Sequence, residues 1–78
     1  MSFSREELVN KLTTLNKVCS EFLRVEKLTG IKSPTMALYL LDMYTRLLAL
    51  DNKNLLSGEV PEVLEAIKIL TILEESRG

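Results

Sequence analysis

The first third of the chain carries apolar residues at alternating steps of four and three, which is the spacing of one face of an α-helix. Ser4 and Glu7 precede this run in the order of a capping box, in which each side chain binds the backbone amide of the other residue. Gly30 follows the run and is the residue type that most easily adopts the left-handed conformation at a helix end. The pattern predicts a helix over residues 5–29, with apolar positions Leu8, Leu12, Leu15, Cys19 and Phe22.

A second apolar pattern begins at Ser33 and Pro34, which suit the cap and the first turn of a helix. From there to residue 51, apolar side chains fill most of the helix circumference and leave only a narrow polar strip. A helix of this kind has to be covered on more than one side. We therefore expect a central helix over residues 34–51 with two apolar stripes: Met36, Leu40, Met43, Leu47 and Leu50 in one, and Ala37, Leu41, Tyr44 and Leu48 in the other.

The last part of the chain follows a polar turn and begins at Pro61, a residue suited to the first turn of a helix. Its β-branched residues also favour a strand, but no second strand is expected that could pair with them. A third helix over residues 61–75 is therefore predicted, and residues 1–78 form a single all-α domain, a three-helix bundle. Apolar residues fall on two sides of this helix: Val63, Ile67 and Leu70 on one, and Ala66, Ile69, Ile72 and Leu73 on the other.

More apolar surface is spread over the second and third helices than one copy of this short chain is expected to cover. A domain of this size buries only about 60% of its unfolded surface, and each helix of a three-helix bundle has two neighbours. Exposed apolar patches above a few hundred Å² usually mark an interface. We expect a homodimer or a complex with another protein; the alternative is a compact monomer whose first helix covers both patches. The expected contact residues are Tyr39, Met43, Ile69, Ile72 and Leu73.

The composition argues against catalysis and metal binding. The chain has no His, which removes Ser–His and Cys–His pairs and imidazole ligands. Its one cysteine, Cys19, lies on the apolar stripe of the first helix, where a thiol is usually inert. The glutamates fall at helix ends or on polar faces, and the three glycines are isolated, so they form no phosphate-binding loop. We expect no enzyme, no cofactor and no metal site.

The expected function is that of a small protein-binding module, a regulator, inhibitor or adaptor that acts through apolar helix faces. Acidic residues near Met1 stand where a signal peptide would carry cations, and no apolar run is long enough to span a membrane. The expected location is therefore the cytoplasm, with no membrane contact.

Residues 24–41 also have the outline of a helix-turn-helix, with a helix end at Gly30 and a new helix start at Ser33. In this alternative the chain is a DNA-binding transcriptional regulator, and Arg24, Lys32 and Thr35 contact the nucleic acid. The first two turns of the would-be recognition helix lack Arg, Lys, Asn and Gln, and the net charge is −1. Protein binding is therefore the favoured interpretation.

Overall fold

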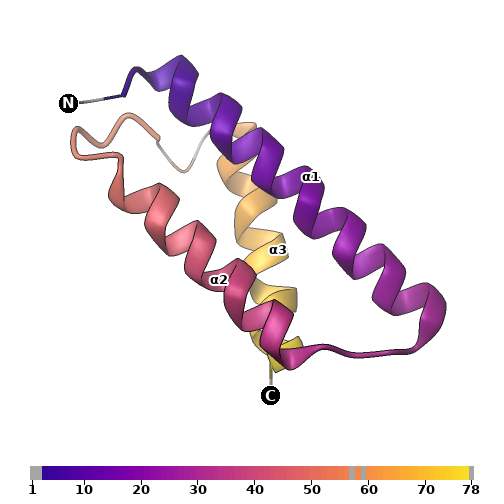
Figure 1. Cartoon of the computed structure of the whole chain (residues 1–78). Coiled ribbons are helices and arrows are strands. Elements are labelled where there is room, and N and C mark those ends of the chain that lie inside the picture. The colour runs from indigo at the N-terminus through magenta and orange to yellow at the C-terminus, as the bar shows by residue number, and fades with distance from the viewer. Residues whose placement is uncertain (1–2, 57, 59, 78) are drawn as a thin grey trace.

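Three helices make up the part of the chain that the structure describes, residues 3–56, 58 and 60–77 of a computed structural model. They are α1 (Arg5–Thr29), α2 (Pro34–Ala49) and α3 (Pro61–Arg77) (Figure 1). The predicted all-α three-helix bundle is confirmed. The bounds of α1 are those predicted, whereas α2 ends two residues earlier than expected and α3 ends two residues later.

Local hydrogen bonds fix both ends of α1. The Ser4 amide donates to Glu7 Oε1 at 3.0 Å, and the Glu7 amide donates to Ser4 Oγ at 3.1 Å, which completes the predicted capping box. Gly30 adopts a left-handed conformation with φ +71°, and its amide donates to the Glu26 carbonyl at 2.8 Å. The long first helix therefore begins and ends where its sequence requires.

Carboxylates hold the two connections between helices. Glu26 is buried, and its Oε2 accepts a hydrogen bond from the amide of Ser33, the N-cap of α2, at 2.8 Å. After α2, the carboxylate of Asp51 accepts from the amides of Leu55 and Leu56 at 2.7 and 2.8 Å. Each carboxylate satisfies backbone donors that the adjoining turn leaves free.

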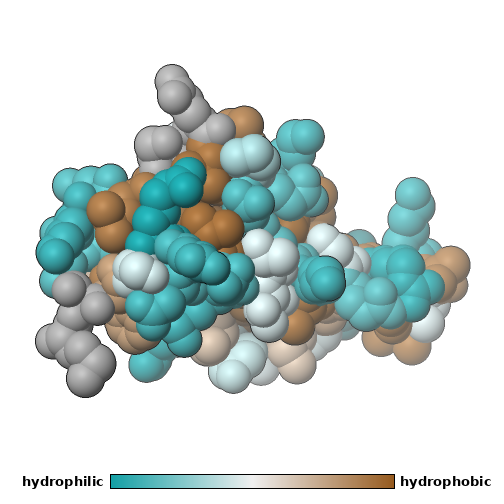
Figure 2. Space-filling model, turned by 90° about the horizontal axis from the view of Figure 1, so that it is seen from above, coloured by the Kyte–Doolittle hydropathy of each residue, from teal (hydrophilic) through white to brown (hydrophobic). Residues whose placement is uncertain are grey.

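The helices α1 and α2 run antiparallel, and α3 crosses behind both of them (Figure 1). Contact between α1 and α2 is the least extensive of the three helix pairs, and contact between α2 and α3 is the most extensive. The end of α1 and the turn after it project from the body of the bundle as a narrower arm (Figure 2). The chain is accordingly elongated, with principal dimensions of 40 × 19 × 16 Å.

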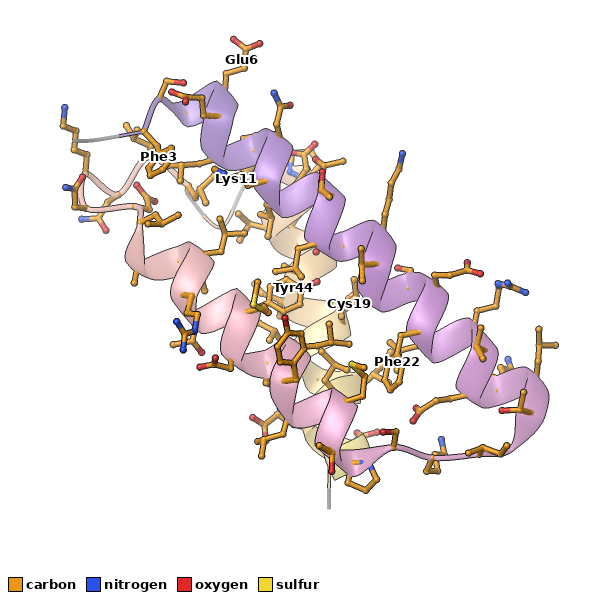
Figure 3. All side chains as sticks on the ribbon, viewed as in Figure 1. Phe3, Glu6, Lys11, Cys19, Phe22 and Tyr44 are labelled. Atoms are coloured by element: carbon orange, nitrogen blue, oxygen red, sulfur yellow. The ribbon has the colours of Figure 1, made fainter. Side chains whose placement is uncertain are left out.

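The core is a cluster of buried side chains from all three helices, which also includes the buried thiol of Cys19. Within it, Asn16 links the helices: its Oδ1 accepts from the Tyr44 hydroxyl at 2.6 Å, and its Nδ2 donates to the Glu62 carbonyl at 3.0 Å. Burial raises the pKa of both the Tyr44 hydroxyl and the Cys19 thiol, which face each other between α1 and α2 (Figure 3). The core residues are Leu12, Cys19, Ala37, Leu40, Tyr44, Leu47, Ala66, Ile69 and Leu73.

Candidate protein-binding groove

The face of the bundle between α1 and α2 is hollowed into an open groove of about 660 Å³, here called the α1–α2 groove. It exists because α3 supports both helices from behind while α1 and α2 touch each other little. The groove is lined by Lys11, Thr14, Leu15, Val18, Tyr39, Leu40, Met43, Arg46, Leu47 and Leu50.

Helical periodicity explains why this groove is apolar. On α1, a line of apolar residues at steps of three and four runs beside the buried stripe and continues past Val18 through Phe22 to Val25. The Phe22 ring points from α1 into the space between α1 and α2 (Figure 3). On α2, Met43 and Leu50 are seven residues apart and therefore lie on one face. Each helix thus buries one stripe in the core and presents a second one to the groove.

The groove is accessible as well as apolar. The Tyr39 side chain is 57% exposed and Val18 is 52% exposed, while Leu15 and Met43 are half-buried and Leu40 and Leu47 are buried. Large apolar side chains in such positions gain little from the fold of one chain, because much of their surface still contacts water. They are therefore free to contribute to an interface.

The charged side chains of the groove lining are both cationic. The Lys11 ammonium lies 5.3 Å from the centre of the Phe3 ring. The Arg46 Nε donates to Asp42 Oδ2 at 2.7 Å, and this hydrogen bond raises the pKa of Arg46. Both cations are exposed, and Asp42 offsets the charge of Arg46, so Lys11 contributes most of the positive character of the rim.

No catalytic or metal-binding arrangement stands out in this groove. Its lining has no carboxylate, thiol or imidazole, and its hydroxyls are those of Thr14 and Tyr39. Among the residues that the structure describes, no three His, Cys, Asp or Glu side chains come together as metal ligands. The arrangement is suited to apolar contact.

The opposite flank of α1, which faces α3, has a different character. This α1–α3 groove, of about 480 Å³, is lined by polar and charged residue types apart from Pro61. Arg24 pairs there with Glu21, three residues earlier on α1, and the pairing lowers the pKa of Glu21. Its lining is Thr13, Asn16, Lys17, Ser20, Glu21, Arg24, Pro61, Glu62 and Glu65.

The structure separates the five contact residues expected from the sequence. Tyr39 and Met43 both line the α1–α2 groove, and Ile72 is exposed on α3 outside that groove. The expectation for Ile69 and Leu73 is wrong, because both are buried in the core at 3% and 0% exposure. The helix α3 is rotated so that these residues face inward while Leu64 and Ile67 face solvent.

Sequence reasoning did not select Leu15, Val18 and Leu50 as contact residues. A signal for them was present, because Val18 widens the apolar face of α1 beyond what one neighbour covers, and Leu50 continues the line of Met43.

The three residues expected to contact nucleic acid, Arg24, Lys32 and Thr35, are all exposed. Arg24 lines the α1–α3 groove, whereas Lys32 lies in the turn and Thr35 in the first turn of α2. The helices α1 and α2 lie antiparallel (Figure 1), whereas the two helices of a helix-turn-helix meet at about 90–120°. The hairpin therefore differs from that motif in geometry.

Comparison of the chain with protein-family models, curated proteins and solved structures gave no match. None of the described helices combines the length and the apolar character that crossing a membrane requires.

Proposed function

We propose that this chain is a small cytoplasmic protein-binding module that holds an amphipathic helix of another protein in the α1–α2 groove. The observation that carries this proposal is an open apolar groove between two helices, in which Tyr39 and Val18 remain more than half exposed. A regulator, inhibitor or adaptor acts by such binding and needs no catalytic group.

A helix is the expected ligand because of the shape and spacing of the groove. Its two walls are helices whose apolar residues recur every three or four positions, and ridges of this spacing pack against those of a third helix. A ligand helix with apolar residues at i, i+3, i+4 and i+7 places its stripe over Leu15 and Met43 and its edges against Val18 and Tyr39. The bound helix then stands as the fourth member of a four-helix bundle.

The rim favours acidic residues beside the apolar stripe of the ligand. Lys11 and Arg46 are the charged residues of the lining and both are cations, although Arg46 is also paired with Asp42, so Lys11 is the main attraction for a carboxylate. Exposed charges of this kind contribute mainly to association rate and to partner choice. The preferred ligand is therefore an amphipathic helix flanked by Glu or Asp, and its binding weakens as salt is added.

Two designed peptides test this proposal by titration calorimetry. Both carry the same leucine stripe at helical spacing, one with glutamate flanks and the other with lysine flanks. The glutamate peptide is expected to bind more tightly and to lose affinity with added salt. Equal affinity for the two peptides would contradict the acidic-helix assignment.

Two variants with matched exposure test the location of the site. Val18→Glu places a carboxylate in the groove and is expected to weaken binding of the glutamate peptide at least about tenfold, because the new charge is buried without a partner. Ile67→Glu changes a residue equally exposed on α3 and is expected to leave binding unchanged. The groove is the wrong site if the two variants have the same effect.

A further inference from the structure

Two large apolar side chains lie at the outer end of the arm that the end of α1 and the turn after it form. Leu28 and Ile31 are each 71% exposed, more than any other large apolar side chain that the structure describes. Hydrophobic atoms reach the far end of this arm (Figure 2). Residues 27–32, all of them exposed, are here called the arm tip.

The charged side chains of the arm tip are both cations. Lys27 and Lys32 stand on either side of the two apolar residues in the sequence, and neither forms an ion pair with a residue that the structure describes. The adjoining Glu26 is only 4% exposed, so its carboxylate does not face the surroundings. One turn earlier on α1, Arg24 is paired with Glu21. The tip therefore combines exposed apolar side chains with unpaired positive charge.

Backbone amides at the arm tip find their acceptors within the turn. The Gly30 amide donates to the Glu26 carbonyl at 2.8 Å, and the Ile31 amide donates to the Thr29 hydroxyl at 3.2 Å. The Ser33 amide donates to the Glu26 carboxylate at 2.8 Å. A polar group that leaves water without a partner is costly, and these amides keep their partners when water is removed. The tip is thus prepared to enter an apolar environment.

An anionic lipid surface offers what this tip requires. It places negative headgroups directly above an apolar layer, so it can receive the cations and the aliphatic side chains together. The phosphates of a nucleic acid would attract the cations but would leave Leu28 and Ile31 in water. Exposed Glu74 and Glu75 belong to the last turns of α3, which end apart from the turn after α1 (Figure 1). A flat surface can therefore reach the projecting tip before it reaches these acidic residues.

We infer that the arm tip binds the surface of a membrane that contains anionic lipids. Leu28 and Ile31 enter the boundary between headgroups and acyl chains, and Lys27 and Lys32 lie beside the headgroup charges. Attachment through two aliphatic side chains and two cations is reversible. The sequence predicts no membrane contact because no segment can span a bilayer, whereas a contact at the surface needs no such segment.

Surface attachment leaves the proposed ligand site free. None of the tip residues lines the α1–α2 groove. The groove can accordingly hold a helix while the tip is bound, and the two activities can be measured separately.

Vesicle flotation of the 78-residue chain tests this inference. Vesicles of phosphatidylcholine and phosphatidylserine in equal parts are compared with vesicles of phosphatidylcholine alone. Binding to the phosphatidylserine vesicles is expected to be at least about tenfold tighter and to weaken as salt is added. Because the chain has no Trp, Ile31→Trp also supplies a single fluorescent probe at the tip. Its emission is expected to shift to shorter wavelength on the phosphatidylserine vesicles.

Three further variants locate the contact. Ile31→Asn removes an aliphatic side chain and is expected to weaken vesicle binding at least about tenfold. The double variant Lys27→Gln, Lys32→Gln is expected to weaken it by about the same factor. Ile67→Asn removes the same type of side chain from an exposed position on α3 and is expected to bind as the wild type does. Circular dichroism of each variant checks that the helices are retained.

Four results would overturn the inference: no binding to the phosphatidylserine vesicles, equal binding to both kinds of vesicle, the same loss in Ile67→Asn as in Ile31→Asn, or tighter binding to duplex DNA than to the phosphatidylserine vesicles. None of these results bears on peptide binding by the α1–α2 groove, which is measured without lipid. Loss of peptide binding with vesicle binding intact would in turn contradict the proposed function alone.

Discussion

The two flanks of α1 use the same helix in opposite ways. On the flank that faces α3, Asn16 is buried and bonded to both other helices, and charged residues line the groove outside it. On the flank that faces α2, Leu15 and Val18 lie in an open apolar groove whose lining contains no carboxylate. The first flank closes the bundle by specific hydrogen bonds, and the second leaves apolar surface uncovered.

This difference indicates which residues the fold requires and which ones it leaves available. The Asn16 side chain accepts from the Tyr44 hydroxyl, which is costly to bury without a partner, and donates a second hydrogen bond to the Glu62 carbonyl of α3. The exposed side chains of Val18 and Tyr39 satisfy no such requirement. The α3-facing flank is therefore expected to govern stability, and the α2-facing flank is expected to govern binding.

The largest expected effect on stability is that of Asn16→Ala. This change leaves the Tyr44 hydroxyl without the Asn16 acceptor and removes the additional hydrogen bond to the Glu62 carbonyl, at a cost of about 2–4 kcal/mol in the free energy of unfolding. Val18→Ala lies two positions along the helix on the other flank. It is expected to change the free energy of unfolding by less than about 0.5 kcal/mol. Urea denaturation followed by circular dichroism measures both. Equal losses for the two variants would show that the flanks do not differ in this way.

A smaller loss in the free energy of unfolding is expected for Tyr44→Phe, which removes only the hydrogen bond between the Tyr44 hydroxyl and Asn16 Oδ1. The cost is about 1–2 kcal/mol, because Asn16 keeps its bond to the Glu62 carbonyl and only its Oδ1 loses a donor. The same urea titration ranks the two core variants. If Tyr44→Phe cost as much as Asn16→Ala, the bond from Asn16 to α3 would contribute nothing.

The smallest expected effect on stability comes from a residue at the start of α1, outside both flanks. The backbone hydrogen bond from Ser4 lowers the pKa of Glu7 below its ordinary value of 4.5. A carboxylate with a lowered pKa stabilises the folded state above that value, and its contribution is lost as the pH falls below it. In Glu7→Gln this part of the pH dependence is absent. The difference in urea midpoint between wild type and variant is therefore expected to shrink below pH 4.5.

A constant difference in urea midpoint between neutral and acidic solution would show that the Glu7 carboxylate does not stabilise the helix start.

The sequence specified helix ends better than helix rotation. Ser4, Glu7 and Gly30 act on neighbouring backbone groups, so the bounds of α1 could be predicted from local chemistry alone. The rotation of α3 could not, because Ile67, Ile69, Ile72 and Leu73 place apolar side chains on several sides of one helix. Which side faces inward then depends on packing against α1 and α2, and this is why Ile69 and Leu73 were wrongly expected at the surface.

The buried polar residues also show that tertiary contacts could not be predicted from the sequence alone. Asn16 lies four residues after Leu12 and three before Cys19, so it stands on the buried stripe of α1. Its spacing indicated burial, but its partner on α2 is 28 residues away in the chain and is fixed only by the tertiary fold. Of the expected contact residues that line the groove, Met43 came from periodicity on α2 and Tyr39 from being an aromatic residue on a very apolar helix, whereas the opposing wall on α1 required knowledge of how the two helices pair.

The most direct measurement of the central claim is an amide NMR titration of the chain with the glutamate-flanked amphipathic peptide. The account predicts that the largest shifts fall on Leu15, Val18, Tyr39 and Met43, on the two walls of the α1–α2 groove. Shifts concentrated on Ser20 and Glu65 of the α1–α3 groove, or no shifts at saturating peptide, would contradict it.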